Sequence, residues 1–103
     1  MFRRVKWLLY RIKCGFWPCD LWDLDYAIVR FALPRLKGFR KGNCSYPAGI
    51  EYGGKVGAEA WSLVLSEIIW AFEHYKNTDG EEELRRMEEG VRLFGEYFFS
   101  LWW

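Results

Sequence analysis

The sequence predicts an all-α fold: a small helical bundle of three long helices plus an N-terminal basic helix. Apolar side chains recur every three or four residues in the second half of the chain, which is the period of an α-helix. No segment shows the alternation of apolar and polar residues that marks a strand. A length of 103 residues, with 51% of them hydrophobic, is typical of one domain with its own core. We therefore assign residues 1–103 to a single helical domain.

Residues 1–14 are expected to form the basic helix. Its apolar residues fall at helical spacing, with Arg and Lys on the other faces: Val5, Leu8, Leu9 and Ile12. Such a helix either packs on its own domain or lies in a membrane interface, an alternative that Trp7 and Tyr10 favour. No transmembrane segment is expected, because the longest stretch without charge has nine residues, from Gly42 to Ile50.

Residues 20–40 are expected to form a kinked helix. Gly15 to Pro18 interrupt the preceding helix, and Asp20 is a good N-cap. Pro34 lies inside the pattern and is expected to kink or divide the helix. The residues expected to face inward are Leu21, Leu24, Ile28, Phe31 and Leu36.

Residues 42–57 are predicted to be a glycine-rich loop, since five of these sixteen positions are glycine. Within it, Gly49 to Val56 approaches the phosphate-binding pattern of nucleotide hydrolases. Val56 stands where that pattern needs a hydroxyl, and no buried strand precedes it, so we do not assign a phosphate-binding loop. A glycine loop that leads into a helix is still able to hold an anion at the helix N-terminus.

Two further helices are predicted at residues 58–76 and 80–101. The first has an apolar stripe of Trp61, Leu65, Ile68, Phe72 and Tyr75. The second has a stripe of Leu84, Met87, Val91, Phe94, Phe98 and Leu101. Its start resembles a capping box, formed by Thr78 with Glu81 or by Asp79 with Glu82. The heptad-like spacing of the second stripe favours antiparallel packing of the two helices.

The charges are distributed unevenly. Residues 1–42 carry ten Lys or Arg and three Asp, a formal charge of +7, whereas residues 43–103 carry five basic and eleven acidic residues, a formal charge of −6. The two halves either neutralise each other, within one chain or between subunits, or leave a basic face that attracts nucleotides, nucleic acid or anionic lipid. We favour neutralisation, because a free basic face usually accompanies a high pI.

Neither a metal site nor a cofactor is predicted. Cys14, Cys19 and Cys44 are poorly spaced for zinc and indicate a reducing compartment, and His74 is the one histidine. Its place near a helix C-terminus favours interaction with the helix dipole. We therefore expect a binding protein rather than an enzyme. The clustered Asp and Glu residues leave a metal-dependent nucleotide hydrolase as an alternative.

Basic residues interleaved with aromatic ones form the candidate ligand site. Arginine suits phosphate, and aromatic faces stack on bases, so this mixture suits a small anionic nucleotide-like ligand or single-stranded nucleic acid. The alternative for each of these residues is a solvated basic face with aromatic rings that fill the core. The candidate ligand-binding residues are Arg30, Arg35, Arg40, Lys41, Tyr46 and Tyr52.

The chain has more aromatic residues than a small core needs: 7 Trp, 6 Tyr and 8 Phe. Those not explained by the helical stripes are expected to be buried against a second subunit, a partner or a ligand. These candidate interface residues are Trp17, Trp22, Trp70, Phe99, Trp102 and Trp103. A homo-oligomer is the expected state, with a host protein as a further candidate partner.

Two blocks of the sequence resemble a group of small bacteriophage and prophage proteins. They are Asp-x-Trp-Asp-Leu-Asp at residues 20–25 and Gly-x-x-Leu-Phe-x-x-Tyr-Phe-x-x-Leu-Trp at residues 90–102. The resemblance implies a setting in the cytoplasm of an infected bacterium and carries no catalytic residues. With the basic and aromatic residues, it leads to the hypothesis of a non-enzymatic protein that sequesters a small nucleotide signal against host defence. The alternative is an interaction or assembly factor that docks a host or phage partner through its aromatic surface.

Overall fold

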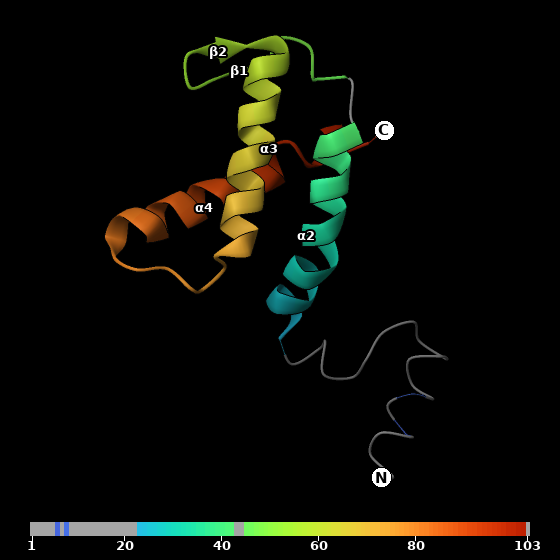
Figure 1. Cartoon of the computed structure of the whole chain (residues 1–103), viewed down its shortest axis with the longest axis vertical. Helices are drawn as coiled ribbons and strands as arrows, with labels where there is room; N and C mark the ends of the chain where they lie inside the picture. Colours follow the sequence, from blue (N-terminus) through green and yellow to red (C-terminus); the bar gives the residue numbers. More distant parts are fainter. Residues whose placement is uncertain (1–5, 7, 9–22, 43–44, 103) are drawn as a thin grey trace. The chain divides into compact units, whose positions relative to one another are not determined.

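The structure is a computed structural model that describes residues 6, 8, 23–42 and 45–102. This part of the chain is mostly helical, with three α-helices and a small two-stranded sheet (Figure 1). The expected all-α class is therefore confirmed in its broad form. Of the predicted helix at 1–14, Lys6 and Leu8 are described and helical, and the rest lies outside the described residues.

The elements follow in the order α2 (Leu24–Gly42), β1 (Glu51–Tyr52), β2 (Lys55–Val56), α3 (Gly57–Glu73), α4 (Glu81–Glu96) and the 3-10 helix η2 (Phe98–Ser100). The chain forms two compact units, Met1–Phe31 and Ala32–Trp103, which meet within the sequence of α2. The predicted single domain stays a prediction.

In the first unit, the start of α2 differs from the expected pattern. Leu24, Ile28 and Phe31 are 56%, 48% and 63% exposed, so the prediction that they face inward is wrong. Val29 is buried instead. This helix carries apolar residues on more than one face, and spacing alone does not show which face is covered.

In the second unit, α2 continues as one helix through Pro34, so the helix is not divided there, and the predicted kink stays a prediction. Leu36 is buried, as expected. The end of α2 contacts α3 through long side chains: Lys37 Nζ lies 3.1 Å from Glu73 Oε2, and the ring of Phe39 meets Trp61 edge-on at 6.5 Å.

Part of the segment predicted as a loop is an antiparallel hairpin. Glu51 pairs with Val56 and Tyr52 with Lys55, which leaves a two-residue turn at Gly53–Gly54. Both turn residues have positive φ, 59° and 76°, as a type I′ turn requires. The Gly-Gly pair between two short segments was the sequence signal for this hairpin, and the expectation of no strand is wrong.

Helix α3 forms the centre of the core. Four of the five residues of its predicted stripe are confirmed as core, with Trp61, Leu65, Ile68 and Phe72 all at most 5% exposed, whereas Tyr75 is half-buried and lies beyond the end of the helix. Ala60, Val64 and Ala71 are buried beside them. The helix ends at Glu73, three residues before the predicted end.

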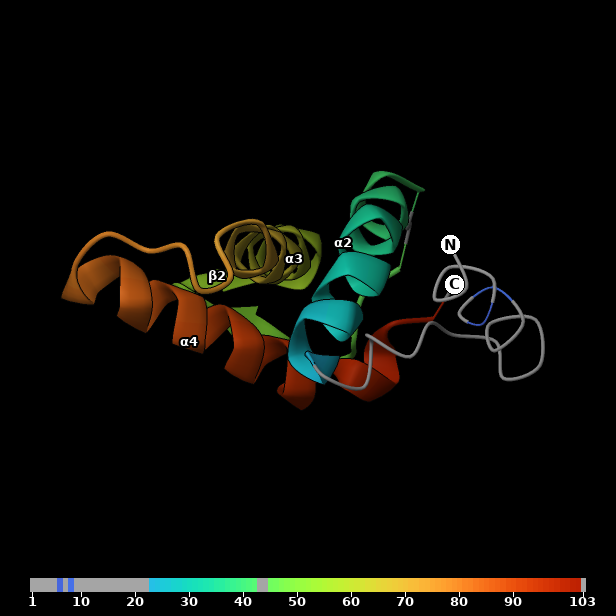
Figure 2. The ribbon, with the colours of Figure 1, turned by 90° about the horizontal axis from the view of Figure 1, so that it is seen from below.

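Helix α4 covers α3 with a different seam from the predicted one. Met87, Gly90 and Leu93 are buried, whereas Leu84, Val91 and Phe98 are 43%, 39% and 55% exposed. In Figure 2, α3 is seen nearly end-on while α4 lies lengthwise, so the two helices cross rather than run antiparallel side by side. The crossing explains the changed seam, because a crossing helix buries a short patch around the point of closest approach.

Both ends of α4 also differ from prediction. The N-cap is Gly80, with φ 89° and no side-chain cap, so neither predicted capping box forms. Glu83 Oε1 instead accepts a hydrogen bond from the backbone N–H of Asp79 over 2.9 Å. The helix ends at Glu96, and η2 follows where a continuous helix to residue 101 was expected.

Candidate ligand-binding pocket

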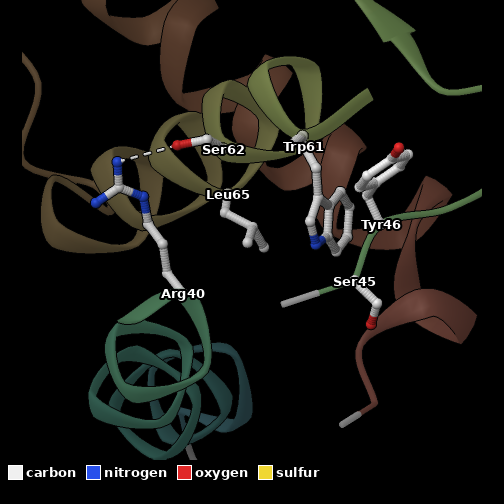
Figure 3. A pocket seen from close by; sticks show the side chains of 7 residues that line it. Arg40, Ser45, Tyr46, Trp61, Ser62 and Leu65 are labelled. Carbon is white, nitrogen blue, oxygen red and sulfur yellow. Dashed lines mark hydrogen bonds between the residues drawn. The ribbon is translucent and has the colours of Figure 1, made fainter. Parts of the chain in front are cut away.

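A pocket of about 180 Å³ opens beside the first turns of α3 (Figure 3). It belongs entirely to the second unit, and three segments build it: the end of α2, the residues before the hairpin, and α3. The lining residues are Arg40, Ser45, Tyr46, Ala58, Trp61, Ser62 and Leu65.

Trp61 supplies a hydrogen-bond donor without an acceptor. Its side chain is 4% exposed, and Nε1 has no hydrogen-bond partner among the described residues. Figure 3 shows this nitrogen on the side of the indole that faces the pocket. A buried N–H left unpaired costs about 1–3 kcal/mol, so an acceptor in the pocket would stabilise the protein.

The position of the Trp61 ring is fixed by its neighbours. Phe39 meets it edge-on, and Tyr97 lies 5.6 Å from it between ring centroids, at 67°. The indole is therefore held between α2 and the end of α4, with Nε1 left on the pocket side.

Among the described residues that line the pocket, Arg40 is the positively charged one. One of its Nη atoms donates to Ser62 Oγ over 3.4 Å, a long hydrogen bond. A guanidinium has five N–H groups in a planar fork that matches phosphate and carboxylate oxygens. The Ser62 hydroxyl is itself able to donate to the same ligand.

Tyr46 forms the rim of the pocket opposite Arg40 (Figure 3). Its ring is 51% exposed and packs over Gly57 at the start of α3, where a Cβ would lie 3.6 Å from the ring. Gly57 has φ 64°, a conformation that favours glycine. Glycine therefore permits the turn from β2 into α3, whereas a Cβ at this position would make only an ordinary van der Waals contact with the Tyr46 ring.

A second pocket of about 290 Å³ adjoins the first. It is lined by Ser45, Tyr46, Pro47, Ser100 and Trp102. Ser45 and Tyr46 line both pockets.

The structure brings together two of the six predicted ligand-binding residues, Arg40 and Tyr46. Arg35 and Lys41 are exposed on α2 and line neither pocket, and Arg30 belongs to the first unit. Sequence reasoning placed Trp61 correctly in the core but missed its N–H. The sequence offered a signal for it, because the indole N–H of a buried Trp normally has a hydrogen-bond partner.

Tyr52 lies away from the pocket, on the hairpin, and is held by α4. Its hydroxyl donates to Glu89 Oε2 over 2.9 Å, and the Arg92 guanidinium makes two hydrogen bonds with the same carboxylate. Burial, and then the hydrogen bond to Glu89, raise the pKa of Tyr52 to about 12. The hydrogen bond from Arg92 lowers the pKa of Glu89. Burial acts in the opposite direction, and the hydrogen bond from Tyr52 lowers this pKa further. Tyr52 therefore fastens the hairpin to α4, and it lines neither of the two pockets described above.

The predicted interface residues separate into two groups. Trp70 has partners within the chain: it stacks on His74 at 4.2 Å, and the Arg86 guanidinium lies 4.1 Å from its ring. Phe99 and Trp102 are 90% and 71% exposed. Trp17, Trp22 and Trp103 lie outside the described residues.

Among the described residues, no three His, Cys, Asp or Glu side chains gather as metal ligands would. The helices of the same part of the chain are too short or too polar to span a bilayer. His74 Nδ1 lies 2.9 Å from the backbone oxygen of Trp70, at the end of α3.

No protein-family model matches this chain, and no curated protein or solved structure matches it either. Function is therefore inferred from the chemistry of the pocket.

Proposed function

We propose that this protein binds a small phosphorylated ligand of the nucleotide type in the Arg40–Trp61 pocket and holds it without converting it. The observation that carries the proposal is the buried Nε1–H of Trp61, which has no hydrogen-bond partner among the described residues and belongs to a side chain that lines the pocket with Arg40 and Ser62. Three donors in one small space require a ligand group that only accepts, and a phosphate oxygen does so.

The backbone favours the same charge. Ala58 lines the pocket from the first turn of α3, where N–H groups lack intrahelical acceptors and the helix dipole is positive. Glu59 is the acid in that turn, and its carboxylate lies 3.7 Å from Lys55 Nζ, which offsets its charge.

The size of the pocket limits what enters it. About 180 Å³ is below the range of about 300–1,000 Å³ for sites that enclose a whole drug-sized ligand. The pocket therefore suits the anionic end of a ligand rather than the entire molecule.

The biological setting of this proposal comes from the resemblance to small bacteriophage proteins. In an infected bacterium, a protein that sequesters a nucleotide signal would keep it from the host proteins that respond to it. Binding without turnover is sufficient for that role.

The test is a thermal-shift screen against cyclic and linear nucleotides at moderate salt, followed by calorimetric titration of any ligand found. Arg40→Ala should weaken binding about tenfold or more, equivalent to about 1.4 kcal/mol, because it removes the charged fork. Lys41→Ala is the matched control: it removes the same charge one residue away, outside the pocket, and should change the affinity less than about twofold. Equal losses in both variants, or no stabilising nucleotide at all, would overturn the proposal.

A second candidate function is supported by the C-terminal segment. Phe99 and Trp102 expose 90% and 71% of their surface, and exposed aromatic clusters are typical of protein interfaces. Under this proposal the protein is an interaction or assembly factor. Size-exclusion chromatography with light scattering tests the simplest form, a homo-oligomer: Phe99→Ser should dissociate it, and a monomeric wild-type protein at micromolar concentration would contradict it.

A further inference from the structure

The second pocket differs chemically from the first. Among the described residues, its lining consists of two aromatic residues, a proline and two serines, none of them charged: Tyr46, Trp102, Pro47, Ser45 and Ser100. A space of this composition suits a neutral planar group rather than a second phosphate.

Both aromatic residues that line this pocket are largely exposed. Tyr46 is 51% exposed and Trp102 is 71% exposed, yet both line the same pocket. Aromatic side chains that stack on nucleobases need such accessible faces. A ring bound between them would remove apolar surface of both side chains from water.

The two pockets share two of their lining residues. Ser45 and Tyr46 belong to both, the first pocket holds Arg40 and the Trp61 N–H, and the second holds Trp102. One ligand with an anionic end and a planar end would therefore pass over Ser45. The two volumes, about 180 and 290 Å³, together fall in the range of small-molecule sites.

We infer that Tyr46 and Trp102 form a base-binding subsite and that the ligand is a nucleoside monophosphate, with its phosphate at Arg40 and Trp61 and its base at Trp102. This inference rests on the proposed function and assigns Trp102 as the residue that distinguishes a nucleotide from other phosphate esters.

The experiment compares AMP, UMP, ribose 5-phosphate and inorganic phosphate by calorimetric titration against the full chain. The wild-type protein should bind at least one of the two nucleotides about tenfold or more tightly than ribose 5-phosphate, because only the nucleotides carry a base to stack. Trp102→Ala should remove that difference and leave the affinity for ribose 5-phosphate within about twofold of the wild-type value. Trp102→Phe should retain part of the difference, since it keeps an aromatic face.

Phe99→Ala is the matched control. It removes an aromatic side chain from the same segment, more exposed than Trp102, that lines neither pocket. Its affinity for the nucleotides should equal that of the wild-type protein, and circular dichroism should show that both variants fold.

The outcomes separate the inference from the proposed function. Equal affinity for nucleotides and ribose 5-phosphate, both sensitive to Arg40→Ala, would overturn the base subsite and leave phosphate binding in place. A nucleotide preference that survives in Trp102→Ala would also overturn it. Failure of every phosphate ligand to bind would overturn both.

Discussion

Gly90 of α4 lies directly against Ala71 of α3. A Cβ at position 90 would overlap the Cβ of Ala71 and would stand 2.6 Å from the backbone oxygen of Glu67. The two helices approach so closely here that only a residue without a side chain fits. The absence of a side chain at position 90 therefore allows α3 and α4 to approach this closely.

Gly90→Ala should therefore lower the free energy of unfolding by about 1–3 kcal/mol, because the added methyl meets backbone that cannot move independently. For a domain of this size, each kcal/mol corresponds to a decrease of roughly 4–8 °C in Tm. Urea denaturation followed by circular dichroism measures the change.

The matched control is Gly95→Ala in the same helix. A Cβ at Gly95 has nothing within 4 Å. The substitution should leave stability unchanged or raise it by up to about 1 kcal/mol, since alanine favours the helix over glycine. If the two variants have equal stability, the close approach at Gly90 is not a determinant of the fold.

Arg86 should contribute more to stability than its neighbour Arg85. Arg86 makes two hydrogen bonds with Glu67, of 2.9 and 3.1 Å, and lies over Trp70, whereas Arg85 has an exposed ion pair with Glu81 at 3.7 Å. Arg86→Ala should lower the free energy of unfolding by about 1–2 kcal/mol, and Arg85→Ala by less than about 0.5 kcal/mol. Urea denaturation at low and high salt compares them, and equal values would contradict the assignment.

Tyr52→Phe should loosen the hairpin from α4. It removes the hydroxyl that donates to Glu89 and keeps the ring, so the expected loss is about 0.5–1.5 kcal/mol. Hydrogen exchange should show faster exchange of the β1 and β2 amides than in the wild-type protein. Tyr46→Phe, which changes the other tyrosine near this segment, should leave that exchange unaltered.

The raised pKa of Tyr52 gives a pH dependence of stability. The folded protein holds this proton up to a pKa of about 12, whereas the unfolded chain loses it near the ordinary tyrosine pKa of 10.0. The contribution of Tyr52 is therefore complete below pH 10 and is lost as the pH rises from about 10 to 12. Urea midpoints between about pH 8 and pH 11 should fall more steeply for the wild-type protein than for Tyr52→Phe, and parallel curves would refute the shift.

The candidate site was only partly readable from the sequence. Composition and spacing singled out Arg40 and Tyr46 because their residue types suit phosphate and stacking. Nothing local distinguished Arg40 from Arg35 or Lys41, since all three stand on the same helix within seven residues. Which of them meets a pocket depends on how the end of α2 approaches α3, a contact between residues more than twenty positions apart, such as Arg40 and Ser62.

The sequence by itself determined the helical character and the buried stripe of α3, because a 3.6-residue period is a local property that each turn of helix repeats. Only the tertiary structure decided which residues of α4 are buried against α3 and whether the Trp61 N–H has an acceptor among the described residues. A glycine carries no hydrophobic signal, yet at Gly90 the two helices approach too closely for a side chain to fit. Trp61 is a core residue whose N–H has no hydrogen-bond partner among the described residues, and its side chain also lines a pocket, an environment that only the folded chain creates.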